Sequence, residues 1–195
     1  CFFMFENLNI GLGITGSFCN FKYIKEVIYS LQDEGANVIP IVSENVKSLD
    51  TRFYKSKDFL EMLESTTKNK VISSIVEAEP IGPKNILDIL VICPCTGNTL
   101  AKIANGITDS TILMAIKSHI RKNKPVVIGI STNDGLGAAF ENIGKVINTK
   151  NFYFVPFSQD DPINKPKSLV LDYSYILDTI KEALENRQIQ PILSK

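Results

Sequence analysis

The sequence predicts an α/β fold in which helices cover both faces of a doubly wound, mostly parallel sheet, giving three layers. Three observations lead to this prediction. Four short runs rich in Ile and Val are apolar on both faces, as are strands buried between two layers of helices. Amphipathic segments with helical spacing separate these runs. Strand and helix patterns then alternate along most of the chain, which is typical of parallel sheets.

The strand-like runs are short, as expected of buried central strands. The four clearest are residues 8–14, 38–42, 89–92 and 126–130. A fifth, at 152–155, ends at Pro156 and fits an edge or terminal strand, because proline cannot donate a hydrogen bond to a neighbouring strand. A sixth candidate, at 71–76, has only a weak pattern.

The helices are predicted from apolar residues that recur at helical spacing. The first carries Tyr23, Ile24, Val27, Ile28 and Leu31, and Gly35 follows as a C-terminal stop. Four more helices are predicted over residues 57–67, 99–105, 109–122 and 168–185. Ligands of such sheets bind beyond the carboxyl ends of the strands, so the loops after residues 14, 42, 92 and 130 are the expected binding loops.

The length of 195 residues suits one domain. We expect residues 1–7 to be an N-terminal extension and residues 8–195 to form a single α/β domain. Met4 is interpreted as the natural start, with residues 1–3 as an added segment. The apolar N-terminus lacks a basic region and a long apolar core, so it does not resemble a signal peptide.

Charge and cysteine content argue against several classes of protein. Lys plus Arg and Asp plus Glu each number 21, so no net positive field attracts nucleic acid or an anionic membrane surface. No apolar stretch approaches the roughly 20 residues of a membrane-spanning helix. Four cysteines are too few for a disulfide scaffold of this length. The sequence therefore predicts a reduced, cytoplasmic protein.

The loop after the first strand predicts a phosphate site. Residues 11–16 match G-x-G-x-x-G, the dinucleotide fingerprint, but the second strand lacks the acidic residue at its end that would hold a ribose. Thr15, Gly16 and Ser17 instead place two hydroxyls and a glycine where a helix begins, which suits a terminal phosphate monoester. Ser43, after the second strand, is either a further phosphate donor or a helix or turn cap.

The loop after the third strand is dense in small polar residues. Cys93 and Cys95 flank a proline and have no nearby His or second cysteine pair, so they make a poor tetrahedral site and no metal is expected. Gly97 is expected to permit close approach of a flat ligand. Asn98 offers both a donor and an acceptor, as the edge of a heteroaromatic ring requires.

This loop resembles the Pro-x-Thr/Ser-x-Asn-Thr segment of the flavoprotein family, which includes phosphopantothenoylcysteine decarboxylases, lantibiotic cysteine decarboxylases and flavin prenyltransferases. The resemblance extends from about residue 8 over nearly the whole chain, with matching blocks at 11–17, 69–72, 75–80, 94–109, 129–134 and 148–157. It implies a Rossmann-like sheet of the flavoprotein type and FMN as cofactor. The implied cofactor-binding residues are Gly13, Thr15, Gly16, Ser17, Ser43, Pro94, Cys95, Thr96, Gly97, Asn98 and Thr99. The turns after the first and third strands are therefore expected to converge on a single hollow shaped for a mononucleotide.

Two departures separate the chain from the family's decarboxylases. Their histidine before the third central strand corresponds to Pro80, and the only histidine here, His119, is expected to have a structural or surface role. Their Pro-x-Met-Asn segment is replaced by residues 131–134, which keep an asparagine, Asn133. The resemblance points instead to a branch that forms one subunit of a two-subunit oxidoreductase, with a partner expected to bind NAD(P).

The implied substrate is a small dicarboxylate, so cations near the strand ends matter. Arg52, in the loop beyond the second strand, is expected to bind a carboxylate, and Asn133 is the other predicted substrate residue; a surface Arg52 paired with Asp50 is the alternative. Asp109 is expected to cap the helix that follows it. No residue is assigned to catalysis. The family also implies a homo-oligomer, trimer or higher.

Two other functions remain open. One is a flavin-dependent decarboxylase or prenyltransferase, which the replacement of the histidine by Pro80 disfavours. The other is a non-catalytic partner subunit whose site binds only an anion such as phosphate. The polar, proline-rich segment 158–167 is either a loop that closes over a site or binds a partner, or an ordered surface loop.

Overall fold

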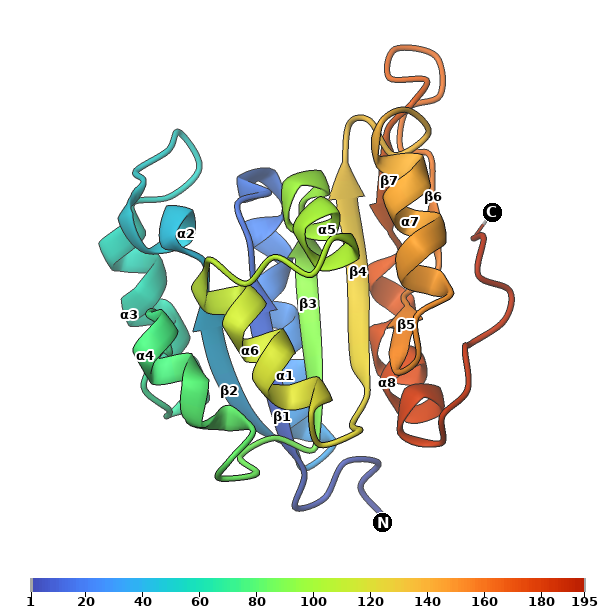
Figure 1. The fold of residues 1–195 in the computed structure, drawn as a ribbon. Coiled ribbons are helices and arrows are strands. Elements are labelled where there is room, and N and C mark those ends of the chain that lie inside the picture. Colours follow the sequence, from blue (N-terminus) through green and yellow to red (C-terminus); the bar gives the residue numbers. More distant parts are fainter. Residues whose placement is uncertain (1, 195) are drawn as a thin grey trace.

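The computed structural model describes residues 2–194, which form one seven-stranded sheet with helices on both faces (Figure 1). The strand order is β2-β1-β3-β4-β7-β6, and β5 pairs with another part of β4. The strands are β1 (Asn9–Ile14), β2 (Asn37–Val42), β3 (Ile89–Cys95), β4 (Val126–Thr132), β5 (Phe152–Phe154), β6 (Phe157–Ser158) and β7 (Leu169–Leu171). The first five are parallel, whereas β7 runs antiparallel to β4 and β6. The predicted α/β fold with a mostly parallel sheet is confirmed.

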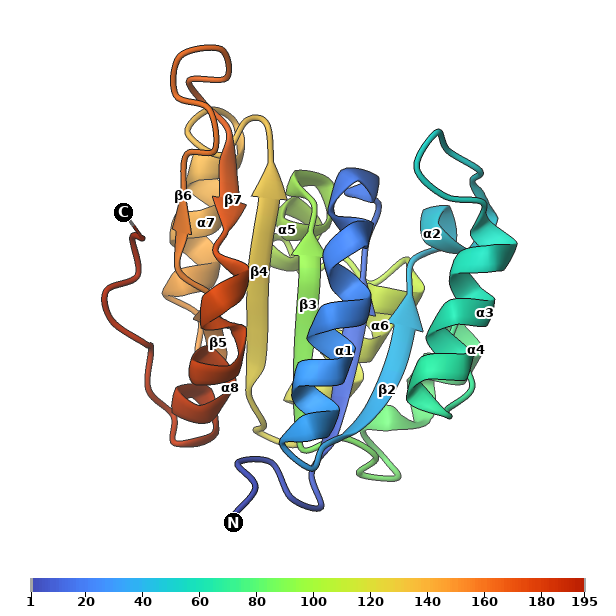
Figure 2. The same ribbon diagram turned by 180° about the vertical axis from the view of Figure 1, so that it is seen from behind.

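The helices divide between the two faces. Helices α1 (Ile24–Asp33) and α8 (Ile176–Leu184) cover one face, and α3 (Ser56–Thr67) packs into the same apolar layer beyond β2 (Figure 2). The other face carries α4 (Ile75–Ala78), α5 (Gly97–Ala104), α6 (Thr111–Ile120) and α7 (Ala139–Ile147). The remaining short elements are α2 (Glu44–Ser48), η1 (Phe18–Tyr23), η2 (Glu79–Ile81) and η3 (Tyr173–Tyr175).

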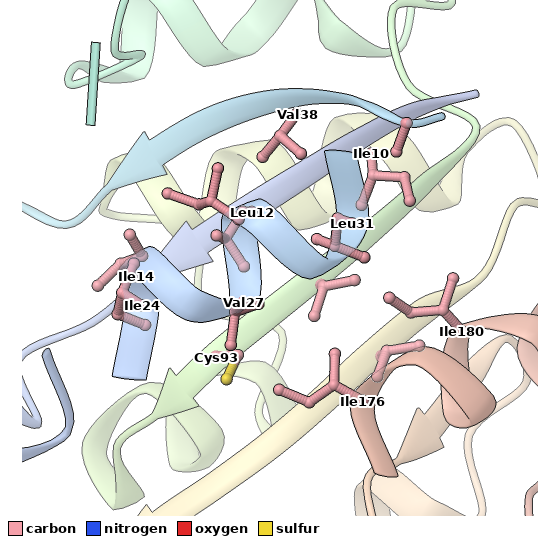
Figure 3. Packing of buried hydrophobic residues seen from close by; sticks show 14 of the residues in the cluster. Ile10, Leu12, Ile14, Ile24, Val27, Leu31, Val38, Cys93, Ile176 and Ile180 are labelled. Carbon is pink, nitrogen blue, oxygen red and sulfur yellow. The ribbon is translucent and has the colours of Figure 1, made fainter. Parts of the chain in front are cut away.

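The two faces of β1 explain its glycines. Ile10, Leu12 and Ile14 point to the layer of α1 and α8 and belong to the same apolar cluster as Val27 and Ile176 (Figure 3). On the opposite face, a Cβ at Gly13 would lie 2.6 Å from Cδ1 of Ile92. Successive residues of a strand alternate between faces, so Gly13 faces the opposite layer, where a larger residue would force the Ile92 side chain to shift.

The two cysteines of β3 lie in different apolar layers. Cys93 belongs to the layer of α1 and α8, whereas Cys95 belongs to the layer of α5 and α6. Residues two apart in a regular strand share a face. The register between β3 and β4 shifts between Ile92 and Cys95, and this irregularity turns the end of the strand.

The C-terminal part of the sheet differs from the prediction. The helix expected over 168–185 is wrong at its start: Leu169–Leu171 forms β7 and the α-helix begins at Ile176. The weak strand candidate at 71–76 is also wrong, since only Ile72 makes an isolated bridge, to Ile41, and α4 begins at Ile75. Helix α7 was not predicted.

The segment before β1 is packed against the domain. Phe5 is fully buried, and its N–H donates to the carbonyl of Glu34 at the end of α1. The apolar core therefore includes part of the segment that the sequence suggested was an extension.

Candidate functional site

Two turns at the carboxyl edge of the sheet are joined by Thr15. Its N–H and its hydroxyl both donate to the carbonyl oxygen of Pro94, at 3.2 and 2.7 Å. The N–H of Thr96 donates back to the Thr15 hydroxyl at 3.0 Å. Thr15 is 1% exposed, so these bonds are shielded from water and hold the turn after β1 against the turn after β3.

Two cavities open where these turns meet. Cavity 1, of about 460 Å³, is bounded by the turn after β1, the end of β4 and the loops that carry Arg52 and Lys165. Cavity 2, of about 390 Å³, lies on the side of α2 and α6. Gly16 and Thr96 line both cavities, and each volume lies in the range of ordinary ligand sites. The sequence predicted a single hollow, whereas the structure has two that share a wall.

The predicted residues divide between these cavities. Those that line cavity 2 are Thr15, Gly16, Ser43, Thr96, Asn98 and Thr99. Those that line cavity 1 are Gly16, Ser17, Thr96, Gly97, Arg52 and Asn133. The remaining three, Gly13, Pro94 and Cys95, line neither cavity. Four of the residues predicted to bind the cofactor (Thr15, Ser43, Asn98 and Thr99) thus line cavity 2 alone, whereas four others line cavity 1 with Arg52 and Asn133.

Packing explains the residues outside the cavities. Gly13 and Cys95 are buried against the layer of α6, and Pro94 contributes the carbonyl that accepts from Thr15. Gly97 also has a structural reason, because a Cβ there would lie 2.7 Å from the hydroxyl oxygen of Thr132. Close packing against β4 is thus a second reason for a glycine at this position, beside the predicted approach of a ligand.

The charges at cavity 2 have partners within the protein. Lys102 Nζ lies 3.0 Å from each carboxylate oxygen of Asp109. One carboxylate oxygen of Glu44 accepts from the N–H and the hydroxyl of Thr111, both at 2.8 Å. Glu44 thereby accepts from an N–H at the N-terminus of α6, and its negative charge interacts favourably with the positive end of the helix dipole. Cavity 2 presents mainly hydroxyl and amide groups to a ligand.

Cavity 1 is lined by two basic side chains and one acidic side chain. Lys165 Nζ lies 3.3 Å from a carboxylate oxygen of Asp160, and hydrogen bonding to Ser168, then to Lys165, lowers the pKa of Asp160. The Arg52 guanidinium lies 4.8 Å from the ring centre of Phe53. Within residues 2–194 Arg52 forms no ion pair, and Asp50 accepts hydrogen bonds from the N–H and the hydroxyl of Ser56.

A cluster that the sequence analysis missed lies on the wall of cavity 1. The side-chain amide of Asn20 donates to the hydroxyl oxygens of Ser17 and Ser131, at 2.7 and 2.9 Å. The two hydroxyls are 2.8 Å from each other. Asn20 is 6% exposed, and η1 and β4 position the three side chains. In the sequence, the only sign of this cluster is that Asn20 is a polar residue among apolar helix positions, which is a weak signal. Its partner Ser131 lies 111 residues further along the chain.

Three further residues have structural roles. Ser43 caps α2 by accepting from the N–H of Val46. Asp109 does not cap α6 as expected, since Ser110 accepts from the N–H of Leu113 and Asp109 pairs with Lys102.

The position that matches the decarboxylase histidine lies away from both cavities. Pro80 is in η2 and lines neither of them. His119 is buried, and its Nε2 lies 2.9 Å from the carbonyl oxygen of Pro125. Burial lowers the pKa of His119 to about 4, so the ring is neutral at pH 7 and donates to that carbonyl. The expected structural role of His119 is confirmed.

The donors around the shared wall suit a phosphate ester. Gly97 and Asn98 are the first two residues of α5, and N–H groups at this position have no carbonyl partner within a helix. The Thr96 hydroxyl satisfies the N–H of Thr99. Free amides at the positive end of a helix bind anions, and the neighbouring hydroxyls and the Asn98 amide suit the neutral parts of a mononucleotide. FMN therefore fits the residues present.

Two other kinds of site receive no support. No cluster of three or more His, Cys, Asp or Glu side chains in the described part of the chain could hold a metal ion. None of the helices between residues 2 and 194 is long and apolar enough to cross a membrane.

Comparisons with known proteins find a matching family and similar proteins. Residues 4–184 match the sequence profile of the Flavoprotein family. The chain is 49% identical over 184 residues to the B subunit of dipicolinate synthase of Bacillus subtilis (strain 168), covering 94% of this chain and 92% of that protein. A crystal structure of the B subunit of dipicolinate synthase from Bacillus halodurans C matches with a TM-score of 0.90 at 43% identity, covering 98% of both chains.

A more distant match concerns the fold alone. The FMN-dependent cysteine decarboxylase SpaF matches with a TM-score of 0.68 at 18% identity, covering 93% of this chain and 97% of that one. At this identity the match shows a shared fold, and a shared fold does not imply a shared activity.

Proposed function

Because the chain belongs to the Flavoprotein family, we propose that it works as the B subunit of a dipicolinate synthase, together with an A subunit. The observation that carries the proposal is the wall that Gly16 and Thr96 share between the two cavities. The proposed mononucleotide site in cavity 2 adjoins, at this wall, the cavity that has two cations in its lining. A redox cofactor and an anionic substrate can therefore lie in contact.

The proposed reaction is the oxidation of dihydrodipicolinate to dipicolinate in spore-forming bacteria. The ring loses a hydride equivalent and a proton and becomes an aromatic pyridine, while both carboxylates are retained. FMN, when bound, would accept the hydride equivalent. A nicotinamide bound by the A subunit is the alternative acceptor of this hydride equivalent.

The chain's own contribution is binding and orientation. We propose that the amides of Gly97 and Asn98 and the hydroxyls near Thr96 bind the cofactor phosphate, with Ser43, Thr99 and the Asn98 side chain along cavity 2. Arg52 and Asn133 would bind the substrate in cavity 1. Excluding water between the two ligands would strengthen both sets of contacts.

The oligomeric state, the partner subunit and the cellular compartment are part of the same proposal. We infer a homo-oligomer, trimer or higher, that binds the A subunit in the cytoplasm. Buried Cys93 and Cys95 suit a reducing compartment, because neither thiol is paired and burial raises both pKa values.

Co-expression with the candidate A subunit tests the proposed function. The purified complex is expected to produce dipicolinate from dihydrodipicolinate, and its absorbance spectrum reports whether a flavin is retained. Full activity of the A subunit alone would overturn the proposal. Turnover of a cysteinyl peptide or a prenyl phosphate by the isolated chain would favour the family's other reactions instead.

A further inference from the structure

The cluster of Ser17, Asn20 and Ser131 has one hydrogen too many for its own contacts. The Asn20 amide group has two hydrogens and gives one to each serine oxygen. The two serines share one further bond, in which one hydroxyl donates to the other. With the amide oxygen of Asn20 turned toward the serines instead, two hydroxyl hydrogens would have to serve three oxygen–oxygen contacts, so one contact would have no hydrogen. The donating orientation is therefore the consistent one.

This arrangement leaves one hydroxyl that can only donate. The serine that accepts from its neighbour also accepts from Asn20, so both of its lone pairs are used while its hydrogen is free. Both Ser17 and Ser131 line cavity 1. A ligand with an acceptor oxygen satisfies this hydrogen, and a carboxylate does so best because the bond is charge-assisted.

Two cations from separate loops line the same cavity as this hydroxyl. Arg52 belongs to the segment after α2 and Lys165 to the loop before β7, and these two segments lie on opposite sides of the turn after β1 (Figure 1). Both residues line cavity 1, where Asp160 is the single acidic side chain in the lining. The lining therefore carries a positive excess of one charge, and the Arg52 guanidinium has no acidic partner among the described residues.

Both loops are held in place by contacts of their own. The ring of Tyr54 lies 6.0 Å from that of Phe21 in η1, and Phe21 stacks on Phe59 of α3 at 4.1 Å. On the other side, the N–H of Lys165 donates to the carbonyl of Asp161 at 2.8 Å. Each cation is thus carried by an ordered turn, which reduces the entropy lost when a ligand binds.

Building on the proposed function, we propose that cavity 1 is a dicarboxylate site in which Arg52 and Lys165 each bind one carboxylate of the substrate. The free hydroxyl of the serine pair donates to an oxygen between them. Lys165 and the Ser17–Asn20–Ser131 cluster are thereby assigned to substrate binding. Asp160 is a positioning residue that holds Lys165 until the carboxylate arrives. A monocarboxylate would use only one of the two cations.

Titration calorimetry on the full chain in metal-free buffer tests this site, with pyridine-2,6-dicarboxylate and pyridine-2-carboxylate as probes. Wild type is expected to prefer the dicarboxylate. Arg52→Ala and Lys165→Ala are each expected to weaken dicarboxylate binding by about tenfold or more and to reduce that preference. Lys57→Ala and Lys167→Ala are matched controls, because neither lysine lines cavity 1, and both are expected to bind like wild type.

Single and double substitutions of the two serines distinguish a role in ligand binding from a purely structural role. Removing either serine alone leaves the other hydroxyl free to donate, so Ser17→Ala and Ser131→Ala are each expected to change affinity by less than about threefold. The double variant has no free hydroxyl and is expected to lose about tenfold for both probes. Equal losses in the two single variants that add up in the double variant would overturn this assignment.

The outcomes separate this inference from the proposed function. If Arg52→Ala and Lys165→Ala bind both probes like wild type, the dicarboxylate site is wrong even if the complex with the A subunit makes dipicolinate. If the variants behave as expected but the complex makes no dipicolinate, the site stands and the proposed function is wrong. Urea unfolding of each variant identifies any loss of affinity that comes from loss of folding.

Discussion

Cavity 1 and cavity 2 lie at the same edge of the sheet and share Gly16 and Thr96, yet their charges are opposite in sign. Cavity 1 is lined by Arg52, Lys165 and Asp160, and cavity 2 by Lys102, Glu44 and Asp109. In cavity 2 every one of these charges has a partner, whereas Arg52 in cavity 1 has none among residues 2–194. The comparison indicates that cavity 1 attracts an anion, whereas cavity 2 suits neutral polar groups.

The difference originates in the loops and not in the strands. The turns after β1 and β3 contribute to both cavities and bring backbone amides and hydroxyls. The charges of cavity 1 come from segments after α2 and before β7, whereas those of cavity 2 come mainly from α2, α5 and the turn before α6. A common strand-end geometry can therefore border two cavities whose linings differ in charge, because loops supply the charged side chains.

The largest effect is expected from Thr15, because both cavities depend on it. Thr15→Val removes the hydroxyl that bonds Pro94 and Thr96 and leaves a shielded N–H without an acceptor. The free energy of unfolding is expected to fall by about 3 kcal/mol, and binding in both cavities is expected to weaken together. Urea unfolding measures the first effect and ligand titration the second. Thr15→Ser, which keeps the hydroxyl, is the control; equal destabilisation by both variants would contradict this explanation.

Acid is expected to weaken the fold through His119, outside both cavities. The folded pKa of about 4 lies below the ordinary value of about 6.5, so the unfolded chain takes up the proton first as pH falls. The stabilising contribution of the neutral ring is full above about pH 6.5 and is lost progressively as the pH falls toward 4. At pH 5 the loss of stability is about 2 kcal/mol.

Unfolding of wild type and His119→Gln between pH 7.5 and 5 measures this contribution. The variant is expected to lose less stability on acidification, since glutamine does not titrate. The same pH dependence in both proteins would show that His119 does not protonate on unfolding. Because this effect acts on the whole fold, the two cavities are best compared above pH 6.5.

Substitutions in cavity 2 are expected to separate its ligand from that of cavity 1. Asn98→Ala and Ser43→Ala each remove one polar group of cavity 2, so FMN affinity is expected to fall by about tenfold or less. Dicarboxylate affinity is expected to stay at the wild-type value. Quenching of FMN fluorescence and titration calorimetry measure the two affinities. Arg52→Ala is the reciprocal control, and parallel losses of both ligands would contradict the division between cavities.

The smallest effect concerns Cys19, an exposed residue that lines cavity 1. In a Cys1→Ser background, iodoacetamide is expected to modify Cys19 first, because burial raises the pKa of Cys93 to about 12 and that of Cys95 further still. Pyridine-2,6-dicarboxylate is expected to slow this reaction severalfold and FMN much less. Mass spectrometry of the modified peptides gives both rates, and equal protection by the two ligands would contradict the comparison.

The parallel half of the sheet could be predicted from the sequence. Strands β1 to β4 are apolar on both faces and are separated by helices with regular apolar spacing, and both signals are local. The antiparallel half could not be predicted in the same way. Strand β7 is three residues long and depends on pairing with Ser131 and Thr132 of β4, far away along the chain.

Helix α7 shows where a usable signal was present. Ala139, Ile143 and Val146 are buried at helical spacing, but Gly135, Gly137 and Gly144 in the same stretch indicate a loop. The apolar spacing alone would have predicted the helix. Tertiary packing of these three side chains outweighs the glycines.

The sequence by itself determined the fold class, the two polar turns and the family, because these depend on local patterns and on blocks of identical residues. Only the tertiary structure decided which glycines serve packing, that the expected hollow is two cavities, and that Asn20 and Lys165 belong to one of them. Those features arise from contacts between residues far apart along the chain, such as Asn20 and Ser131, which are 111 positions apart. Local sequence patterns do not indicate which distant residues come into contact.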